Sequence, residues 1–228
     1  MRYLIPWMDH RFIKRFVKVE GLQHLDGMLR KGRGVLLMAG HIGVPHLAFN
    51  ALRVMGYHVI LLSGVTPKKA KHPRVRYYDT SDQTIFVHDL SLSETYKRRI
   101  LDTLGSGKII YYDGDAGEGR VKERIPFLGK EMEFPTGMLH LARQANAAVI
   151  PFIHLLRRGD MTLIFKAPYD QGWEEGKEAY GRIVREFAGL LESYVLRYPE
   201  QYLGIYGPTV LDYYYRSQRK GCTGSGEA

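Results

Sequence analysis

Residues 35–39, Val-Leu-Leu-Met-Ala, constrain the fold more than any other stretch of this chain, because they form an apolar run bounded by glycines. The run is too short for a helix and is typical of a strand buried on both faces. Apolar residues then recur at helical spacing up to residue 55, and a second apolar run covers residues 59–62. Strand, helix, strand in about 30 residues predicts a βαβ unit with a parallel pair. His41 follows the first strand directly, at the carboxyl end where such sheets bind ligands.

Composition favours one domain of a globular protein. The chain has 228 residues, 45% of them hydrophobic, which is enough for one sizeable core. Its net charge of +9 suits acidic partners, among them anionic lipid, an acidic carrier protein or nucleic acid. The single cysteine, Cys222, excludes an intramolecular disulfide and a cysteine zinc cluster, which fits a reducing compartment.

Residues 1–18 form an amphipathic N-terminal segment. Phe12, Ile13, Phe16 and Val17 make one face of an expected helix that is otherwise rich in arginine and lysine. Such a helix either lies in a membrane interface or packs on the core of its own domain, and both interpretations are open. No stretch approaches the roughly 20 apolar residues that span a bilayer, so we expect no spanning segment and no exported precursor.

The rest of the chain alternates between helices and strands. We expect helices over residues 19–33, from residue 91 or 93 to 104, from residue 135 or 136 to 147, and over residues 174–197. Strands are expected at residues 84–87, 108–112, 148–153 and 162–166, the last two antiparallel across a short turn. Residues 113–137 are expected to be one long loop, and long loops are often functional. Residues after about 221 are expected to be a flexible tail.

Several motifs occur in an order that resembles a known family. They are Gly-His-Ile-Gly-Val-Pro-His at residue 40, Asp-Gly-Asp-Ala-Gly-Glu-Gly at 113, Pro-Phe-Leu-Gly at 126, Pro-Thr-Gly at 135 and Pro-Glu-Gln-Tyr-Leu at 199. Together they resemble the lysophospholipid acyltransferase superfamily, particularly its bacterial lipid A biosynthesis (lauroyl and myristoyl) acyltransferase branch. The resemblance covers residues 19–205, leaving residues 206–228 as an aromatic and basic C-terminal segment. It implies a single α/β domain of the glycerol-3-phosphate acyltransferase type, with a mostly parallel, mixed sheet flanked by helices.

The resemblance also implies a chemistry. A fatty acyl group moves from a thioester, on acyl carrier protein or coenzyme A, to a hydroxyl or amine of a lipid-linked or small-molecule acceptor. His41 would be the general base, no bound cofactor is needed, and the protein would sit peripherally on the anionic cytoplasmic face of the inner membrane. A non-catalytic descendant that binds lipid or acyl carrier is the alternative, and nucleic-acid binding is disfavoured because the basic residues form no recognised motif.

His46 departs from the family pattern, which has an acidic residue five positions after the histidine. That carboxylate normally orients the base and stabilises its protonated form, which a neutral imidazole does less well. Either Asp113 or Asp115 replaces the missing acid, or the acceptor is a better nucleophile, or the protein only binds. The two aspartates are also open to a plain turn-forming role, and a metal site built with His41 and His46 is disfavoured by their spacing.

Basic and glycine-rich loops supply the candidate substrate-binding residues. The loop after residue 62 carries arginines and lysines that suit a phosphate or an acidic carrier, and the glycines of residues 114–119 suit a phosphate. The candidate catalytic residues are His41, His46, Asp113 and Asp115, and the candidate substrate-binding residues are Gly43, Arg74, Arg76, Gly114, Gly117, Arg120 and Thr136.

Overall fold

The computed structural model describes residues 8–63, 84–86, 94–115, 121–169 and 177–202. Its elements are α1 His10–Phe16, β1 Val17–Glu20, α2 Leu22–Arg30, β2 Val35–Ala39, α3 Pro45–Val54, β3 Val59–Ser63, β4 Thr84–Phe86, α5 Glu94–Gly105, β5 Ile109–Asp113, β6 Lys122–Phe127, β7 Lys130–Pro135, α6 Gly137–Gln144, β8 Ala148–Arg157, β9 Asp160–Phe165, α7 Lys177–Arg197 and η4 Pro199–Gln201. Of the expected positions, Val87, Ser91, Ser93 and residues 174–176 lie outside the described residues.

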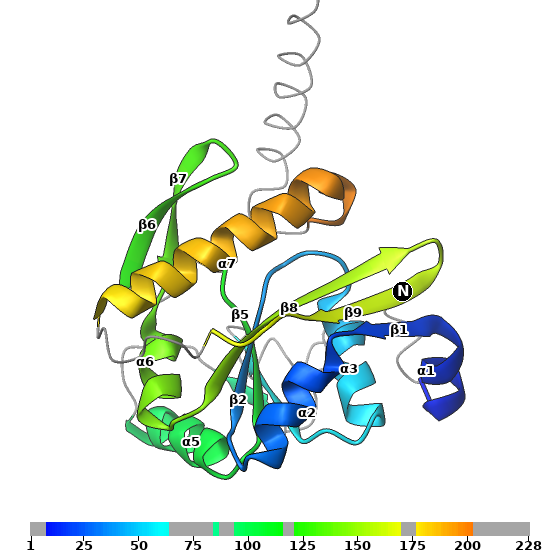
Figure 1. Ribbon diagram of the computed structural model, residues 1–228, viewed down its shortest axis with the longest axis horizontal. Helices are drawn as coiled ribbons and strands as arrows, with labels where there is room; N and C mark the ends of the chain where they lie inside the picture. Colours follow the sequence, from blue (N-terminus) through cyan, green and yellow to red (C-terminus); the bar gives the residue numbers. More distant parts are fainter. Residues whose placement is uncertain (1–7, 64–83, 87–93, 116–120, 170–176, 203–228) are drawn as a thin grey trace, which may run out of the picture.

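A seven-stranded sheet with the order β1-β9-β8-β2-β5-β3-β4 is the centre of the molecule (Figure 1). All neighbouring strands are parallel except β8 and β9, which are antiparallel as the short turn between them predicts. The expected α/β class with a mostly parallel, mixed sheet is therefore confirmed. One detail of the βαβ unit is wrong: β2 and β3 run parallel but are not neighbours, because β5 pairs with both of them.

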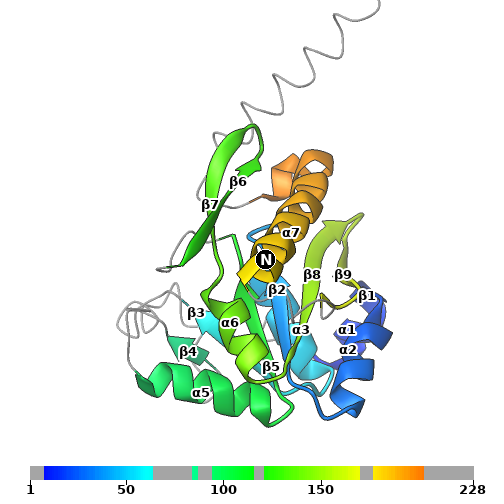
Figure 2. The same ribbon diagram turned by 60° about the vertical axis from the view of Figure 1, so that its left-hand side comes forward.

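Helices cover the two faces of the sheet, as Figures 1 and 2 show. Along β2, Leu36 and Met38 face the core beneath α5, α6 and α7, whereas Val35, Leu37 and Ala39 face the core beneath α1, α2 and α3. Every residue of β2 is buried for this reason, which explains why the strand is apolar throughout instead of alternating.

The chain before residue 21 differs from the expected helix. Helix α1 ends at Phe16, and Val17–Glu20 forms β1, an edge strand that pairs with β9 and in which half-buried and exposed residues alternate. Met8 is buried in the core, and Phe12 and Ile13 pack against it. Of the two interpretations of this segment, packing on the core of its own domain therefore holds for Met8, Phe12 and Ile13. The next helix, expected from residue 19, begins only at Leu22, because Gly21 adopts a left-handed conformation with φ of 72°.

The expected loop over residues 113–137 is also wrong, because β6 and β7 pair as an antiparallel hairpin within it. Alternation explains the hairpin: Ile125, Phe127, Met132 and Phe134 face the core while charged neighbours face outward. The hairpin stands beside α7 (Figure 2), where the backbone N–H of Leu128 donates to a carboxylate oxygen of Glu192 at 2.7 Å. No helix within the described residues is long and apolar enough to cross a membrane.

Candidate active site

The adjacent parallel strands β2 and β5 bring the site residues together at their carboxyl ends. Ala39, the last residue of β2, pairs with Asp113, the last residue of β5. The backbone N–H of Gly114 donates to the carbonyl of Ala39 at 2.7 Å, which holds the chain beyond β5 against the chain beyond β2. A Cβ at Gly114 would lie 2.8 Å from the Cε of Met38, so a larger residue there would have to displace the end of this flexible side chain.

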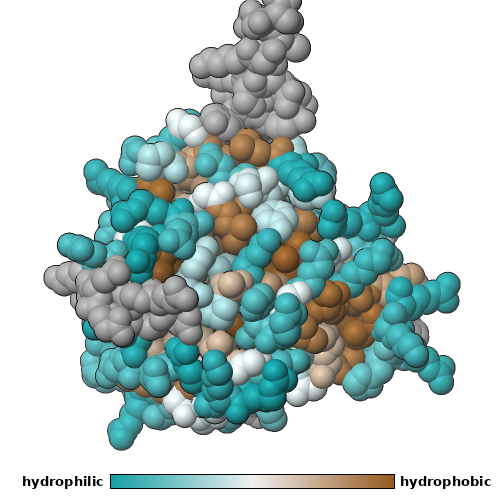
Figure 3. Space-filling view, viewed as in Figure 1, coloured by the Kyte–Doolittle hydropathy of each residue, from teal (hydrophilic) through white to brown (hydrophobic). Residues whose placement is uncertain are grey.

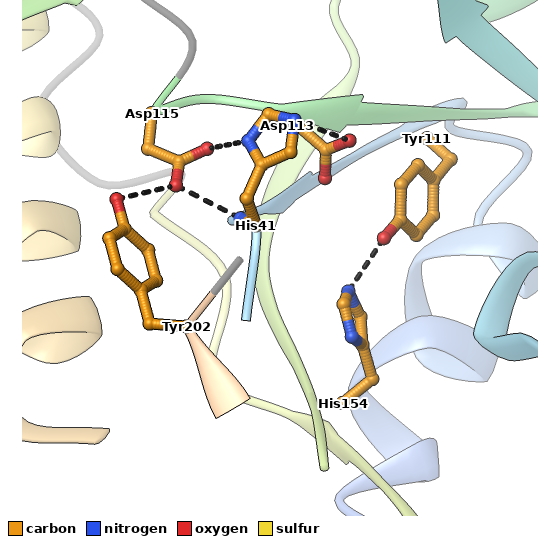
Figure 4. A network of polar contacts seen from close by, with 6 residues as sticks. All are labelled: His41, Tyr111, Asp113, Asp115, His154 and Tyr202. Atoms are coloured by element: carbon orange, nitrogen blue, oxygen red, sulfur yellow. Dashed lines mark hydrogen bonds and ion pairs between the residues drawn. The ribbon is translucent and has the colours of Figure 1, made fainter. Parts of the chain in front are cut away.

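Asp115 and His41 form the central pair of the site (Figure 4). Oδ1 of Asp115 lies 2.7 Å from Nδ1 of His41, and the backbone N–H of His41 donates to Oδ2 at 2.9 Å. The hydroxyl of Tyr202 donates to the same Oδ2 at 3.0 Å. The Asp115 side chain is fully buried, whereas that of His41 is 34% exposed. Because a carboxylate only accepts, Nδ1 carries the proton of the neutral imidazole and Nε2 has the lone pair.

Asp113 lies on the other side of the imidazole. Its Oδ2 is 3.8 Å from Nε2 of His41, and its side chain is 20% exposed. Burial raises the pKa of Asp113 from 3.8 to about 6, while the nearby His41 acts in the opposite direction. The site therefore holds one carboxylate in contact with Nδ1 and a second carboxyl group, whose pKa burial raises, near Nε2.

A buried pair, Tyr111 on β5 and His154 on β8, lies close to this site (Figure 4). Their side chains are fully buried, and the Tyr111 hydroxyl lies 2.6 Å from Nε2 of His154. Burial lowers the pKa of His154 to about 3, so this histidine is neutral at neutral pH. His154 was not among the residues predicted from the sequence, although a histidine inside an otherwise apolar strand is an informative signal.

The short segment from Pro199 to Tyr202 closes the site from the C-terminal side. Tyr202 forms an isolated β-bridge with Ile42, and the backbone N–H of Gly43 donates to the carbonyl of Gln201 at 2.7 Å. The Gln201 side chain accepts from the N–H of Leu156 at 2.8 Å and donates to its carbonyl at 2.9 Å. The segment resembles a motif of the family, but the sequence analysis predicted no site residue in it.

Of the candidate residues, the structure places His41, Gly43, Asp113, Gly114 and Asp115 at or directly after the carboxyl ends of β2 and β5. Gly43 has φ of 71°, and a Cβ there would overlap the carbonyl oxygen of His154 on β8, so the turn after His41 requires glycine.

The other candidates are His46, Thr136 and four residues outside the described part of the chain. His46 is half-buried in the first turn of α3, and Nδ1 of His41 contacts Asp115. Thr136 is buried at the start of α6, where its hydroxyl donates to the carbonyl of Val121 at 3.3 Å. Arg74, Arg76, Gly117 and Arg120 lie outside the described residues. Across the described part of the chain, no three histidine, cysteine or acidic side chains gather as metal ligands would.

An α/β sheet with an imidazole held by a buried carboxylate at its carboxyl edge defines a class of proteins that do acid–base chemistry on a bound substrate. A model of the bacterial lipid A biosynthesis acyltransferases matches residues 1–206. The chain therefore belongs to this family, and it is an acyltransferase that acts on lipid-type substrates.

Among solved structures, the chain is similar to the 1-acyl-sn-glycerophosphate acyltransferase PlsC of Thermotoga maritima, with 16% identity and a TM-score of 0.47. That match covers 85% of this chain and 76% of the other. A search of curated proteins gave no match.

Proposed function

We propose that this protein transfers a fatty acyl group from an acyl thioester to a hydroxyl or amine, with His41 as general base and Asp115 as the carboxylate that orients it. The observation that carries the proposal is the 2.7 Å contact between Nδ1 of His41 and the fully buried Asp115. This contact supplies the orienting carboxylate that the family pattern has five positions after the histidine and that this chain lacks at His46. It favours replacement of the missing acid by Asp115 over a more reactive acceptor and over a protein that only binds.

The proposed reaction starts from the neutral imidazole with its proton on Nδ1. Nε2 takes the proton of the acceptor O–H or N–H, and the acceptor atom attacks the thioester carbonyl carbon. The C–S bond then breaks, and the departing sulfur takes the proton from the imidazolium, leaving a new ester or amide and a free thiol. Asp115 stabilises the imidazolium from the Nδ1 side, and the ionised form of Asp113 adds negative charge near Nε2 at 3.8 Å.

Donor and acceptor are proposed by class only. Acyl carrier protein or acyl-coenzyme A is the donor, and a lipid-linked or small-molecule compound is the acceptor. We propose that Gly43 and Gly114 keep the backbone close to the reacting atoms, because a Cβ at Gly43 would overlap a backbone carbonyl and a Cβ at Gly114 would displace the end of the Met38 side chain. Thr136 and the candidates outside the described residues stay predictions as substrate-binding residues.

We also propose a peripheral position on an anionic membrane surface, with the cytoplasmic face of the inner membrane as the expected location. Helix α1 exposes Arg11, Lys14 and Arg15, and Phe16 beside them is 37% exposed. Figure 3 shows apolar side chains near β1 next to hydrophilic ones, the mixture that suits a membrane interface. Co-sedimentation with anionic and neutral vesicles measures this, and equal binding to both would contradict it.

Release of free thiol from acyl carrier protein or acyl-coenzyme A, with candidate acceptors supplied, tests the catalytic proposal. His41→Ala should abolish acyl transfer, and Asp115→Asn should lower turnover by as much as about 10⁴-fold, the loss seen when a serine protease loses its orienting aspartate. His46→Glu should not raise turnover, because Asp115 already provides the charge.

The matched control is His58→Ala, since His58 is an exposed histidine directly before β3, at the amino end of that strand. This variant should keep full activity. Normal turnover in His41→Ala would contradict the catalytic assignment. Acyl binding without turnover in the wild type would instead support the non-catalytic alternative.

A further inference from the structure

Tyr202 touches the site through an oxygen that the proposed mechanism depends on. Its hydroxyl donates to Oδ2 of Asp115 at 3.0 Å, the same oxygen that accepts the backbone N–H of His41. Tyr202 is itself buried, and its ring packs against Phe127 of the β6–β7 hairpin with 6.2 Å between ring centroids. The contact is therefore made inside the protein, where solvent does not substitute for a missing donor.

We propose that Tyr202 is a positioning residue, which fixes the Asp115 carboxylate in the plane and orientation that His41 requires, and that Gln201 holds Tyr202 in place. The inference rests on the proposed function, because it assigns a role to Tyr202 in the same acid–base pair.

The geometry of the carboxylate supports this role. Oδ1 is directed to Nδ1 of His41, while Oδ2 receives one donor from the backbone of His41 and one from Tyr202 (Figure 4). Two donors on Oδ2 and one on Oδ1 leave the carboxylate little freedom to rotate about its bond to Cβ. Without the phenol hydroxyl, the only remaining donor to Oδ2 among the described residues is the backbone N–H of His41, which is the residue that Asp115 orients. Tyr202 is therefore the donor that fixes Asp115 independently of His41.

The anchoring of the segment supports it further. The side-chain amide of Gln201 hydrogen-bonds to both the N–H and the carbonyl of Leu156 on β8. It thus makes the two hydrogen bonds that a residue of a neighbouring strand would make. The backbone carbonyl of Gln201 accepts from Gly43, and Tyr202 bridges Ile42, which places the segment against the turn that carries His41. The position of the hydroxyl is thus fixed from β8 and from the His41 turn together.

The test is Tyr202→Phe, which removes the hydroxyl and keeps the ring against Phe127. We expect kcat to fall about tenfold, because a hydrogen bond to a buried charge is lost, with KM nearly unchanged. We also expect the acidic limb of the pH–rate profile to move to higher pH by about half a unit. With one donor fewer, the negative charge of Asp115 acts more strongly on the imidazolium, which then persists to higher pH.

Several ionisable groups besides Tyr202 surround the pair, and they are the same in the wild type and in the variant. Asp113 on β5, Asp115 after β5 and His154 on β8 interact with His41, whereas Tyr112 on β5 interacts with the two aspartates and His46 on α3 with His154. The variant changes none of them, so a displaced limb reports the loss of the hydroxyl alone.

Tyr57→Phe is the matched control, because the hydroxyl of Tyr57 donates to Oδ1 of Asp26 at 2.7 Å in a pair remote from the site in sequence and fold. It removes a similar tyrosine–aspartate hydrogen bond and should leave kcat and the pH profile unchanged. A double variant completes the test. If Tyr202 acts through Asp115, Tyr202→Phe should cost little more in a protein that already carries Asp115→Asn.

The outcomes separate this inference from the proposed function. Wild-type kcat in Tyr202→Phe, or an acidic limb that does not rise, overturns the role of Tyr202 while leaving His41 as the base. A tenfold loss that persists in full in the Asp115→Asn background overturns it as well. Retained turnover in His41→Ala contradicts the proposed function itself.

Discussion

Because His154 is buried as a neutral imidazole, the free energy of unfolding should fall at acidic pH, and one substitution at this residue tests that expectation. The side chain is fully buried on β8, with the Tyr111 ring stacked at 6.0 Å and the Phe152 ring at 5.4 Å between centroids. Burial is the main reason that its pKa falls from 6.5 to about 3. The folded protein therefore holds this imidazole neutral under conditions in which an unfolded chain would protonate it.

The sign and size of the effect follow from this difference. Below pH 6.5 the unfolded chain binds a proton that the folded protein does not, so the free energy of unfolding falls as the pH falls. The free energy of unfolding is unaffected by this titration above pH 6.5, and it falls progressively as the pH is lowered from 6.5 to about 3. At pH 5 the loss from this residue amounts to about 2 kcal/mol.

His154→Gln keeps a side chain that can hydrogen-bond to the Tyr111 hydroxyl, and it removes the titrating group. The variant has its own packing cost, which is the same at each pH, so the quantity to compare is the change in unfolding free energy between about pH 7.5 and pH 5. We expect this change to be smaller by about 2 kcal/mol in the variant than in the wild type, measured by urea denaturation. His58→Gln, at an exposed histidine, is the control and should behave as the wild type. Equal pH dependence in wild type and His154→Gln would refute the reasoning.

Two other substitutions test the backbone and charges of the site. Because burial raises the pKa of Asp113 to about 6, this carboxyl costs stability as the pH rises from about 4 through 6, and Asp113→Asn should raise the unfolding free energy by about 2 kcal/mol more at pH 7.5 than at pH 4. Urea denaturation at both pH values measures this, and an equal gain at both would count against it. Gly43→Ala should destabilise the protein more than Gly56→Ala in thermal unfolding. Both glycines have positive φ, which costs alanine about 1–2 kcal/mol, but only the Cβ at Gly43 would overlap a backbone carbonyl. Equal losses would show that this overlap relaxes.

The strands that carry the site were predictable because their burial leaves a plain signal. Residues 35–39 are apolar throughout since both faces of β2 are covered, and His41 at their end is confirmed at the carboxyl edge of the sheet. The family was predictable for a different reason, because its motifs keep their order along the chain. The catalytic roles of His41 and Asp115 stay predictions.

Other parts of the fold and site give weak local signals. In strand β1, half-buried and exposed residues alternate over four positions only, which is too short to distinguish from the end of a helix. In the β6–β7 hairpin, the charged residues between Ile125 and Phe134 conceal an alternation that is clear once burial is known. Tyr202 could not be assigned at all, since its meaning depends on contact with a residue 87 positions earlier.

The proposed acid–base site is built from three segments that are widely separated in the chain. His41 and Asp115 are 74 residues apart, and Tyr202 lies 87 residues beyond Asp115. Closing loops of this length costs entropy before the contacts compensate for it, so we expect the site to form late in folding. The order of synthesis also delays the site. A nascent chain contains His41 early and Asp115 about halfway, but it lacks Tyr202 until α7 has been made. Newly made chains should therefore acquire full turnover only after the sheet is complete, and activity during refolding should recover no earlier than the last native contacts.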